Sequence, residues 1–171
     1  DKAIKLIKLR GIDIDVDNLQ YDDKNVFKLF AKGMTAGIFQ FESSGMREFL
    51  KKLKPTALED LIAMNALYRP GPMNNIDDYI DRKHRKKKIR YSHPRLEPIL
   101  KETHGIIVYQ EQVMQIANEI GGFSMAEADI MRRAMGKKIA ELMKKSAEKF
   151  ITGAVKRGIN KSKAIEIVEL I

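Results

Sequence analysis

Apolar residues recur at the spacing of an α-helix along much of this chain, and this periodicity constrains the fold more than any other feature of the sequence. Residues three and four positions apart share one face of a helix, so apolar residues at this spacing form a stripe that packs against a core. One such stripe consists of Met46, Phe49, Leu50 and Leu53. A second, just before the glycine pair 121–122, consists of Val113, Ile116, Ala117 and Ile120. We therefore expect a series of packed helices.

Capping signals and prolines indicate where several of these helices begin and end. Thr56 and Glu59 have the spacing of a capping box, in which each side chain accepts a hydrogen bond from the other residue's backbone N–H. This helix is expected to run to about Tyr68, because the prolines of the following RPGP disfavour helical geometry before them. Ser124 and Glu127 have the same capping spacing and open a later helix.

Two further short helices are predicted to begin at Ile76 and near Pro94. A long helix is predicted to end at Gly158, and Asn160 or Ser162 can cap the last helix. Only two segments are candidate strands: 36–42 (AGIFQFE) and 105–109 (GIIVY). The predicted class is mainly α, with at most a few short strands.

Composition fits one compact unit without disulfides. The chain has 171 residues, of which 44% are hydrophobic and none is cysteine. A unit of this size buries roughly 70% of its unfolded surface. The lack of cysteine excludes thiolate metal sites and favours a cytoplasmic protein, and no apolar run approaches the roughly 18 residues of a membrane span. The chain begins at Asp1 and stops inside the run AIEIVELI, so we expect a piece of a larger protein.

The net charge of +9 is concentrated in the second half of the chain. Residues 82–163 carry 20 Lys/Arg against 8 Asp/Glu, whereas residues 1–81 are nearly neutral. This asymmetry points to a polyanionic partner, of which nucleic acid fits best. The densest run is RKHRKKKIR at 82–90, which is either a mobile basic loop or a contact to the DNA backbone through Arg82, Lys83, Arg85, Lys86, Lys87, Lys88 and Arg90.

Several other patterns suggest chemistry but fail on spacing. Asp13, Asp15 and Asp17 alternate with apolar residues and would share one face of a strand, yet an EF-hand loop counted from Asp13 lacks its glycine and its final glutamate. The three histidines have no zinc-binding spacing, and neither a GxSxG elbow nor a GxxxxGK[ST] loop occurs. We predict no metal site and no catalytic residue in this chain.

The octapeptide MRRAMGKK at 131–138 places four cations around a glycine without an acid among them. Taken alone, it is either a solvated helix end or an anion site. Together with GIFQFESSGM, LYRPGPM, HPRLEPILKETHGIIVYQEQVMQIA and AEADIMRRAMGKK, it resembles the alpha subunits of bacterial DNA polymerase III, the replicative polymerases of family C. The resemblance is strongest between residues 37 and 138.

The resemblance implies a multi-helix fingers domain at 36–171, preceded by a connection from the palm at 1–35. It implies that the triphosphate of the incoming dNTP is bound by Arg132, Arg133, Lys137 and Lys138. Because four cations repel one another, we expect the helix to be marginal there and to bend or end at Gly136; ordered acidic partners for both arginines would count against this.

Four further residues are candidates for the active-site cleft through the same resemblance: Arg69, Tyr109, Gln110 and Gln112. Two of them have a competing structural role, since Arg69 lies in a helix-stopping turn and Tyr109 has the spacing of the Val113 stripe.

The resemblance also implies DNA-directed DNA polymerase activity for the full-length protein, with dNTP and primer–template DNA as substrates. It implies Mg²⁺ held by palm aspartates outside this chain, so that the fragment alone is inactive. The sliding clamp and other replisome subunits are the further expected partners, and no membrane is expected. The alternative is a free-standing basic helical module that binds nucleic acid without a catalytic role.

Overall fold

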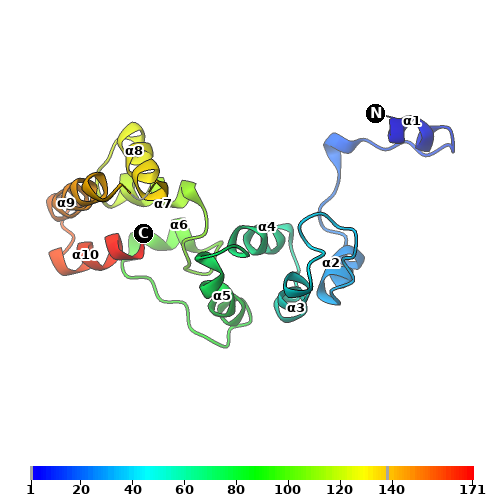
Figure 1. Ribbon diagram of the computed structural model, residues 1–171, viewed down its shortest axis with the longest axis horizontal. Coiled ribbons are helices and arrows are strands. Elements are labelled where there is room, and N and C mark those ends of the chain that lie inside the picture. The colour runs from blue at the N-terminus through cyan, green and yellow to red at the C-terminus, as the bar shows by residue number, and fades with distance from the viewer. Residues whose placement is uncertain (1, 138) are drawn as a thin grey trace.

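The computed structural model describes residues 2–137 and 139–171, and in these ranges it contains helices and no strand. The prediction of a mainly α fold is thus confirmed. The α-helices, labelled in Figure 1, are α1 Lys2–Lys8, α2 Lys24–Ala31, α3 Ser44–Leu53, α4 Leu58–Leu67, α5 Ile76–Lys83, α6 Glu97–Leu100, α7 Gln110–Glu119, α8 Met125–Gly136, α9 Ala140–Lys156 and α10 Lys161–Leu170. Short 3-10 helices lie at Val16–Asn18, Pro72–Asn75 and Pro94–Leu96. No helix in the described ranges is both long and apolar enough to span a bilayer.

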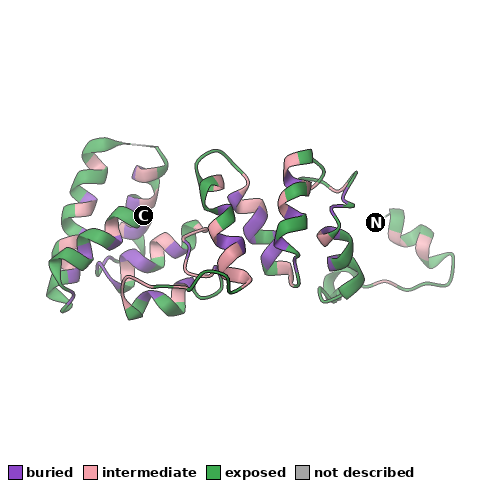
Figure 2. Ribbon diagram, turned by 90° about the horizontal axis from the view of Figure 1, so that it is seen from below, coloured by how far each residue is buried: buried purple, intermediate pink, exposed green. Residues whose placement is uncertain are grey.

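The helices pack around two separate cores, which follow one another along an elongated body (Figure 1). The first core lies between α2, α3, α4 and α5, and the fully buried side chains Leu50, Met64 and Tyr79 form its centre. The second core is formed by the five helices from α6 to α10, and the fully buried side chains Ile116 and Phe150 lie within it. In Figure 2 the buried residues lie on the facing sides of these helices.

Helix α1 projects away from the body on an extended connection, and none of its residues is buried (Figures 1 and 2). By contrast, Phe27 and Phe30 of α2 are buried in the first core. The packed body therefore begins at α2, before residue 36, and the assignment of 1–35 to a connection from a palm stays a prediction.

Both candidate strands are wrong. Segment 36–42 forms a series of turns, in which Gly37 and Gln40 have positive φ and the Thr35 hydroxyl donates to the Phe41 carbonyl oxygen at 2.6 Å. Residues 106–109 are irregular, because the N–H groups of Val108 and Tyr109 donate to a side chain rather than to a neighbouring strand. Ile38, Phe41, Val108 and Tyr109 pack against the first core without strand pairing, since burial can satisfy the preference of aromatic and β-branched residues as well as a sheet can.

The cap of the Ser124 helix is confirmed, and that of the Thr56 helix is shifted. The Ser124 N–H donates to the Glu127 carboxylate at 3.0 Å, and the Glu127 N–H donates to the Ser124 hydroxyl at 3.3 Å. Helix α4 instead begins at Leu58, which moves the capping carboxylate from Glu59 to Asp60. Asn160 caps α10 by accepting a hydrogen bond from the Ser162 N–H at 2.9 Å.

Two glycines allow α9 to approach closely the turn that follows α7, in the second core. A Cβ atom added to Gly153, in the middle of α9, would overlap the carbonyl oxygen of Gly121, which follows α7. A Cβ atom on Gly121 would likewise meet the Phe150 ring at 2.5 Å. The absence of side chains at both positions is therefore a condition for this packing.

Candidate functional site

Two neighbouring arginines near the end of α8 share one carboxylate. Ala128, Met131 and Ala134 turn toward the second core, which leaves Asp129, Arg132 and Arg133 on the outer face. An Nη atom of each arginine lies 2.6 Å from a different carboxylate oxygen of Asp129. Because residues three and four positions apart are neighbours on a helix, a single aspartate can hold both guanidinium groups side by side.

A residue of α7 completes the surroundings of Arg132. Its Nη1 donates to the Gln110 side-chain oxygen at 2.9 Å, while its Nε and Nη2 donate to Asp129 at 3.0 and 2.6 Å. The side chain of Arg132 is consequently only 28% exposed, against 59% for Arg133. Two predicted site residues, Gln110 and Arg132, are thus brought into direct contact although they belong to different helices.

The arginines lower the pKa of Asp129. The hydrogen bond from Arg132, followed by the charge of Arg133, lowers the pKa of the Asp129 carboxyl below its usual value. Both arginines have an ordered acidic partner, which counts against the expectation that unbalanced cations leave this helix end marginal. The helix does end at Gly136, as expected, and the Lys137 N–H closes its last turn by donating to the Arg133 carbonyl oxygen at 3.0 Å.

Asp129 is a residue of this cluster that the sequence reasoning missed. The signal was present, because its spacing of three and four residues to the arginines is that of helical ion pairs. Lys137 is exposed at the C-cap, one residue beyond the helix. Lys138, the fourth predicted phosphate ligand, lies outside the described residues.

Of the remaining cleft candidates, Gln112 has structural contacts in this fold, and its place in a cleft stays a prediction. Its side chain is buried, accepts hydrogen bonds from the Val108 and Tyr109 N–H groups at 2.8 and 3.0 Å, and donates to the Thr103 hydroxyl at 2.9 Å. Gln112 therefore fixes the backbone at the N-terminus of α7. Tyr109 is half-buried against the first core, and burial raises its pKa to about 12, so that its phenol is neutral.

Arg69 is exposed in the turn between α4 and the 3-10 helix that begins at Pro72. Among the described residues, no hydrogen bond or ion pair joins Arg69 to the arginine cluster of α8. Its role in a cleft stays a prediction.

The basic run 82–90 divides into internal and exposed cations. Lys83 forms a buried ion pair with Asp60 at 2.8 Å, and Arg82 donates to the carbonyl oxygens of His104 and Gly105 and to Asp78. The prediction that Arg82 and Lys83 contact DNA is therefore not supported by their positions.

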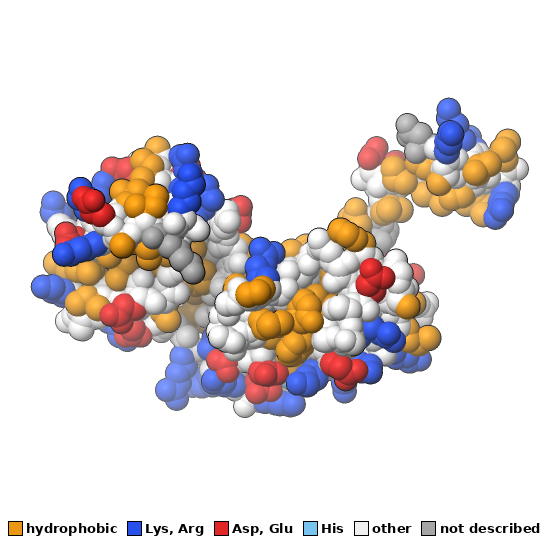
Figure 3. Space-filling model, viewed as in Figure 1, with side chains coloured by type: hydrophobic (Ala, Val, Ile, Leu, Met, Phe, Trp, Pro, Cys, Tyr) orange, Lys and Arg blue, Asp and Glu red, His pale blue; other side chains and the backbone are white. Residues whose placement is uncertain are grey.

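The other five cations of the run are exposed: Arg85, Lys86, Lys87, Lys88 and Arg90. Lys87 pairs with Asp78 at 2.7 Å, and Lys86 lies 4.0 Å from Asp81. Figure 3 shows lysine and arginine side chains interspersed with acidic ones along the lower edge, over α5 and the loop that follows it.

The Asp13–Asp17 segment contains a local hydrogen-bonded turn. Asp15 caps the 3-10 helix at Val16–Asn18, and its two carboxylate oxygens accept hydrogen bonds from the Asp17 N–H and the Asn18 side chain at 3.0 and 2.6 Å. Across residues 2–137 and 139–171, no three Asp, Glu or His side chains are grouped so that they could hold a metal ion.

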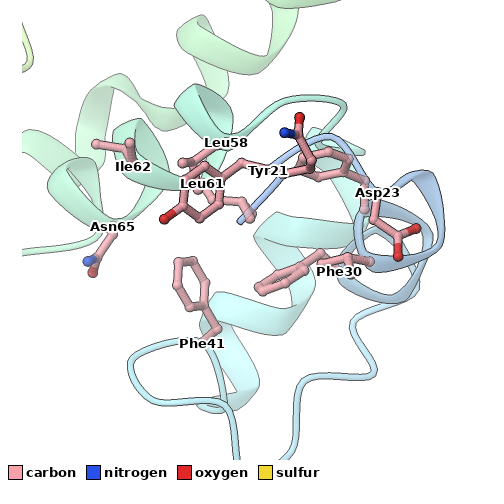
Figure 4. A pocket seen from close by; sticks show the side chains of 11 residues that line it. Tyr21, Asp23, Phe30, Phe41, Leu58, Leu61, Ile62 and Asn65 are labelled. Atoms are coloured by element: carbon pink, nitrogen blue, oxygen red, sulfur yellow. The ribbon is translucent and has the colours of Figure 1, made fainter. Parts of the chain in front are cut away.

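An apolar cavity of about 390 Å³ lies between α2 and α4 and was not predicted. Figure 4 shows Tyr21, Phe30, Phe41 and Leu61 gathered around it. Its only charged lining residue is Asp23, so it is unsuited to an anionic ligand such as a triphosphate.

The amino-acid sequence is similar to that of a known protein family. Residues 1–158 match the family model described as the finger domain of the bacterial DNA polymerase III alpha subunit. A DNA polymerase III subunit alpha of Staphylococcus aureus (strain N315) is 49% identical over 168 residues, which cover 98% of this chain and 16% of that protein. Its counterpart from Halalkalibacterium halodurans is 52% identical over 161 residues, which cover 94% of this chain and 14% of that protein. The chain therefore spans 14–16% of the length of these relatives.

Proposed function

Because the chain belongs to the finger-domain family of bacterial DNA polymerase III alpha subunits, we propose that it forms the fingers of a replicative DNA-directed DNA polymerase. In this proposal α8 binds the triphosphate of the incoming dNTP, and the exposed cations of the loop after α5 contact primer–template DNA. The observation that carries the proposal is the pair of guanidinium groups held side by side on α8 by one carboxylate.

The arrangement suits a strongly anionic ligand. The negative charge of a triphosphate must be neutralised while the phosphoryl group is transferred, and a guanidinium can bind two phosphate oxygens at once. Arg133 meets Asp129 through one Nη atom and is the more exposed of the two arginines, so most of its five N–H donors face solvent. A phosphate approaching α8 would compete with Asp129 for Arg133.

Catalysis itself is assigned to parts of the protein outside this chain. The carboxylates described here do not fit a Mg²⁺ site, since Asp15 uses both oxygens for local hydrogen bonds and Asp13 pairs with Lys8. Mg²⁺ bound by palm aspartates, the sliding clamp and the other replisome subunits belong to the proposal for the full-length, cytoplasmic protein, and this chain alone is expected not to extend a primer.

Replacing Arg132 or Arg133 by alanine in the full-length polymerase tests the nucleotide site. Each variant lacks charge-assisted hydrogen bonds, so we expect kcat/KM for dNTP incorporation to fall roughly 10- to 150-fold. The measurement is single-nucleotide extension of a primed template, alongside primer–template affinity, which should change little. Lys144→Ala, which removes an exposed cation of α9, is the matched control.

Two outcomes would contradict this assignment. Unchanged incorporation by both alanine variants would remove the arginines from the nucleotide site. Uniformly weaker DNA binding, without a specific loss of dNTP incorporation, would favour the alternative of a basic nucleic-acid-binding module.

The DNA contact is tested by its salt dependence. Removing Arg85, Lys88 or Arg90 should weaken primer–template binding for all sequences and reduce the slope of log affinity against log salt by about one for each phosphate that is no longer neutralised. Lys87→Ala should have a smaller effect, because the ammonium group of Lys87 is already paired with Asp78. Equal slopes for the wild type and all four variants would exclude the loop as a DNA contact.

A further inference from the structure

We propose that Gln110 is a positioning residue, which together with Asp129 holds the Arg132 guanidinium in one orientation while Arg133 exchanges Asp129 for a phosphate. This inference rests on the proposed nucleotide site and gives its two arginines different roles, one fixed and one mobile. It is carried by the hydrogen bond between the Gln110 side-chain oxygen and Arg132 Nη1, which links the start of α7 to the end of α8.

The three N–H-bearing nitrogens of Arg132 are all engaged. Nε and Nη2 donate to one oxygen of Asp129, and Nη1, the remaining nitrogen of the guanidinium group, donates to Gln110. Rotation of this group would break bonds to two different helices. Arg133, in contrast, is tied to Asp129 through a single Nη atom and can turn away by breaking that one interaction.

Such a division has a physical advantage for binding a charged substrate. A group that is already oriented loses little conformational freedom when the ligand arrives, and donors set in place before the reaction stabilise charge better than donors that must reorganise. Arg132 would present its remaining Nη hydrogens as a preset contact. Arg133 would supply the adaptable one, whose counterion at rest is Asp129.

The role of Gln110 is not explained by packing. The residue is exposed at the first position of α7, so its side chain is available to act on Arg132 without contributing to either core. Gln115 lies on the same helix and is also exposed, which makes it a matched comparison. The contact joins helices that pack extensively on each other, so the distance between Gln110 and Arg132 is set by the fold rather than by the loop between them.

A double-mutant cycle in the full-length polymerase tests the proposal through kcat and KM for dNTP, measured by single-nucleotide incorporation. We expect Gln110→Ala to lower kcat/KM roughly tenfold, mainly through a higher KM, as for one hydrogen bond to a charged group. In an Arg132→Ala background the same change should alter kcat/KM less than about twofold, because its target is gone. Gln115→Ala should behave like the wild type.

The outcomes separate this proposal from the one on which it rests. If Arg132→Ala leaves incorporation unchanged, the nucleotide site itself is misassigned. If Arg132→Ala impairs incorporation but Gln110→Ala does not, Arg132 needs no positioning by Gln110. An equal effect of Gln110→Ala in both backgrounds would mean that Gln110 acts on the substrate directly, and the positioning role would be overturned.

Discussion

Replacing Lys83 by alanine should lower the free energy of unfolding by about 3–5 kcal/mol, the range for removing one partner of a buried ion pair. The Lys83 ammonium lies 2.8 Å from the Asp60 carboxylate and 3.0 Å from the Thr56 hydroxyl, and the two charged side chains are only 11% and 8% exposed. Without Lys83, the Asp60 carboxylate would be left in the protein interior with only hydroxyl and amide donors around it.

Urea unfolding of the wild-type and variant chains measures the loss, and hydrogen exchange should localise it to α4 and α5. The double variant Lys83→Met with Asp60→Asn should recover much of the stability, since the amide oxygen still caps α4 and no unpaired charge remains. Lys52→Ala, which breaks an exposed pair with Asp77, should cost less than about 1 kcal/mol. A Lys83 variant as stable as the Lys52 variant would mean that the pair is hydrated in solution.

This ion pair marks a limit of what the sequence could predict. Lys83 sits in a run of seven Lys/Arg, and nothing in the run distinguishes the cations that turn inward from those that face solvent. Its partner Asp60 is 23 residues away in sequence. Local periodicity located the helices because it depends only on near neighbours, whereas the fate of a charged side chain depends on which distant element packs over it.

The candidate site likewise combines features that local sequence predicts with contacts that depend on distant packing. The family was predicted from long motifs and is confirmed, and Arg132 and Arg133 were named from the sequence. Asp129 could have been found from helical spacing alone. The contact between Gln110 and Arg132 could not, because it depends on how α7 packs against α8. Gln112, two residues further along α7, was assigned to the same cleft, and only its burial reveals a structural role.

Replacing Gly153 by alanine should destabilise the second core by at least about 3 kcal/mol, at the upper end of overpacking effects. The added methyl group would overlap the Gly121 carbonyl oxygen, which is backbone and cannot turn aside as a side chain could. Helix α9 would have to move away from the turn that follows α7, and the packing of buried Phe150 against Gly121 would loosen. Urea unfolding of the chain, with hydrogen exchange in α7 and α9, measures the effect.

Gly136→Ala provides the comparison, because Gly136 is also helical, at the last position of α8, but has no neighbouring atoms that an added methyl group would meet. No atom lies within 4 Å of a Cβ built on Gly136, so helix propensity alone predicts a change between zero and a gain of about 1 kcal/mol. The same propensity would favour alanine at position 153, which means that a loss there can come only from the steric overlap. If both variants were equally stable, α9 would lie further from the turn after α7 in solution than it does in this structure.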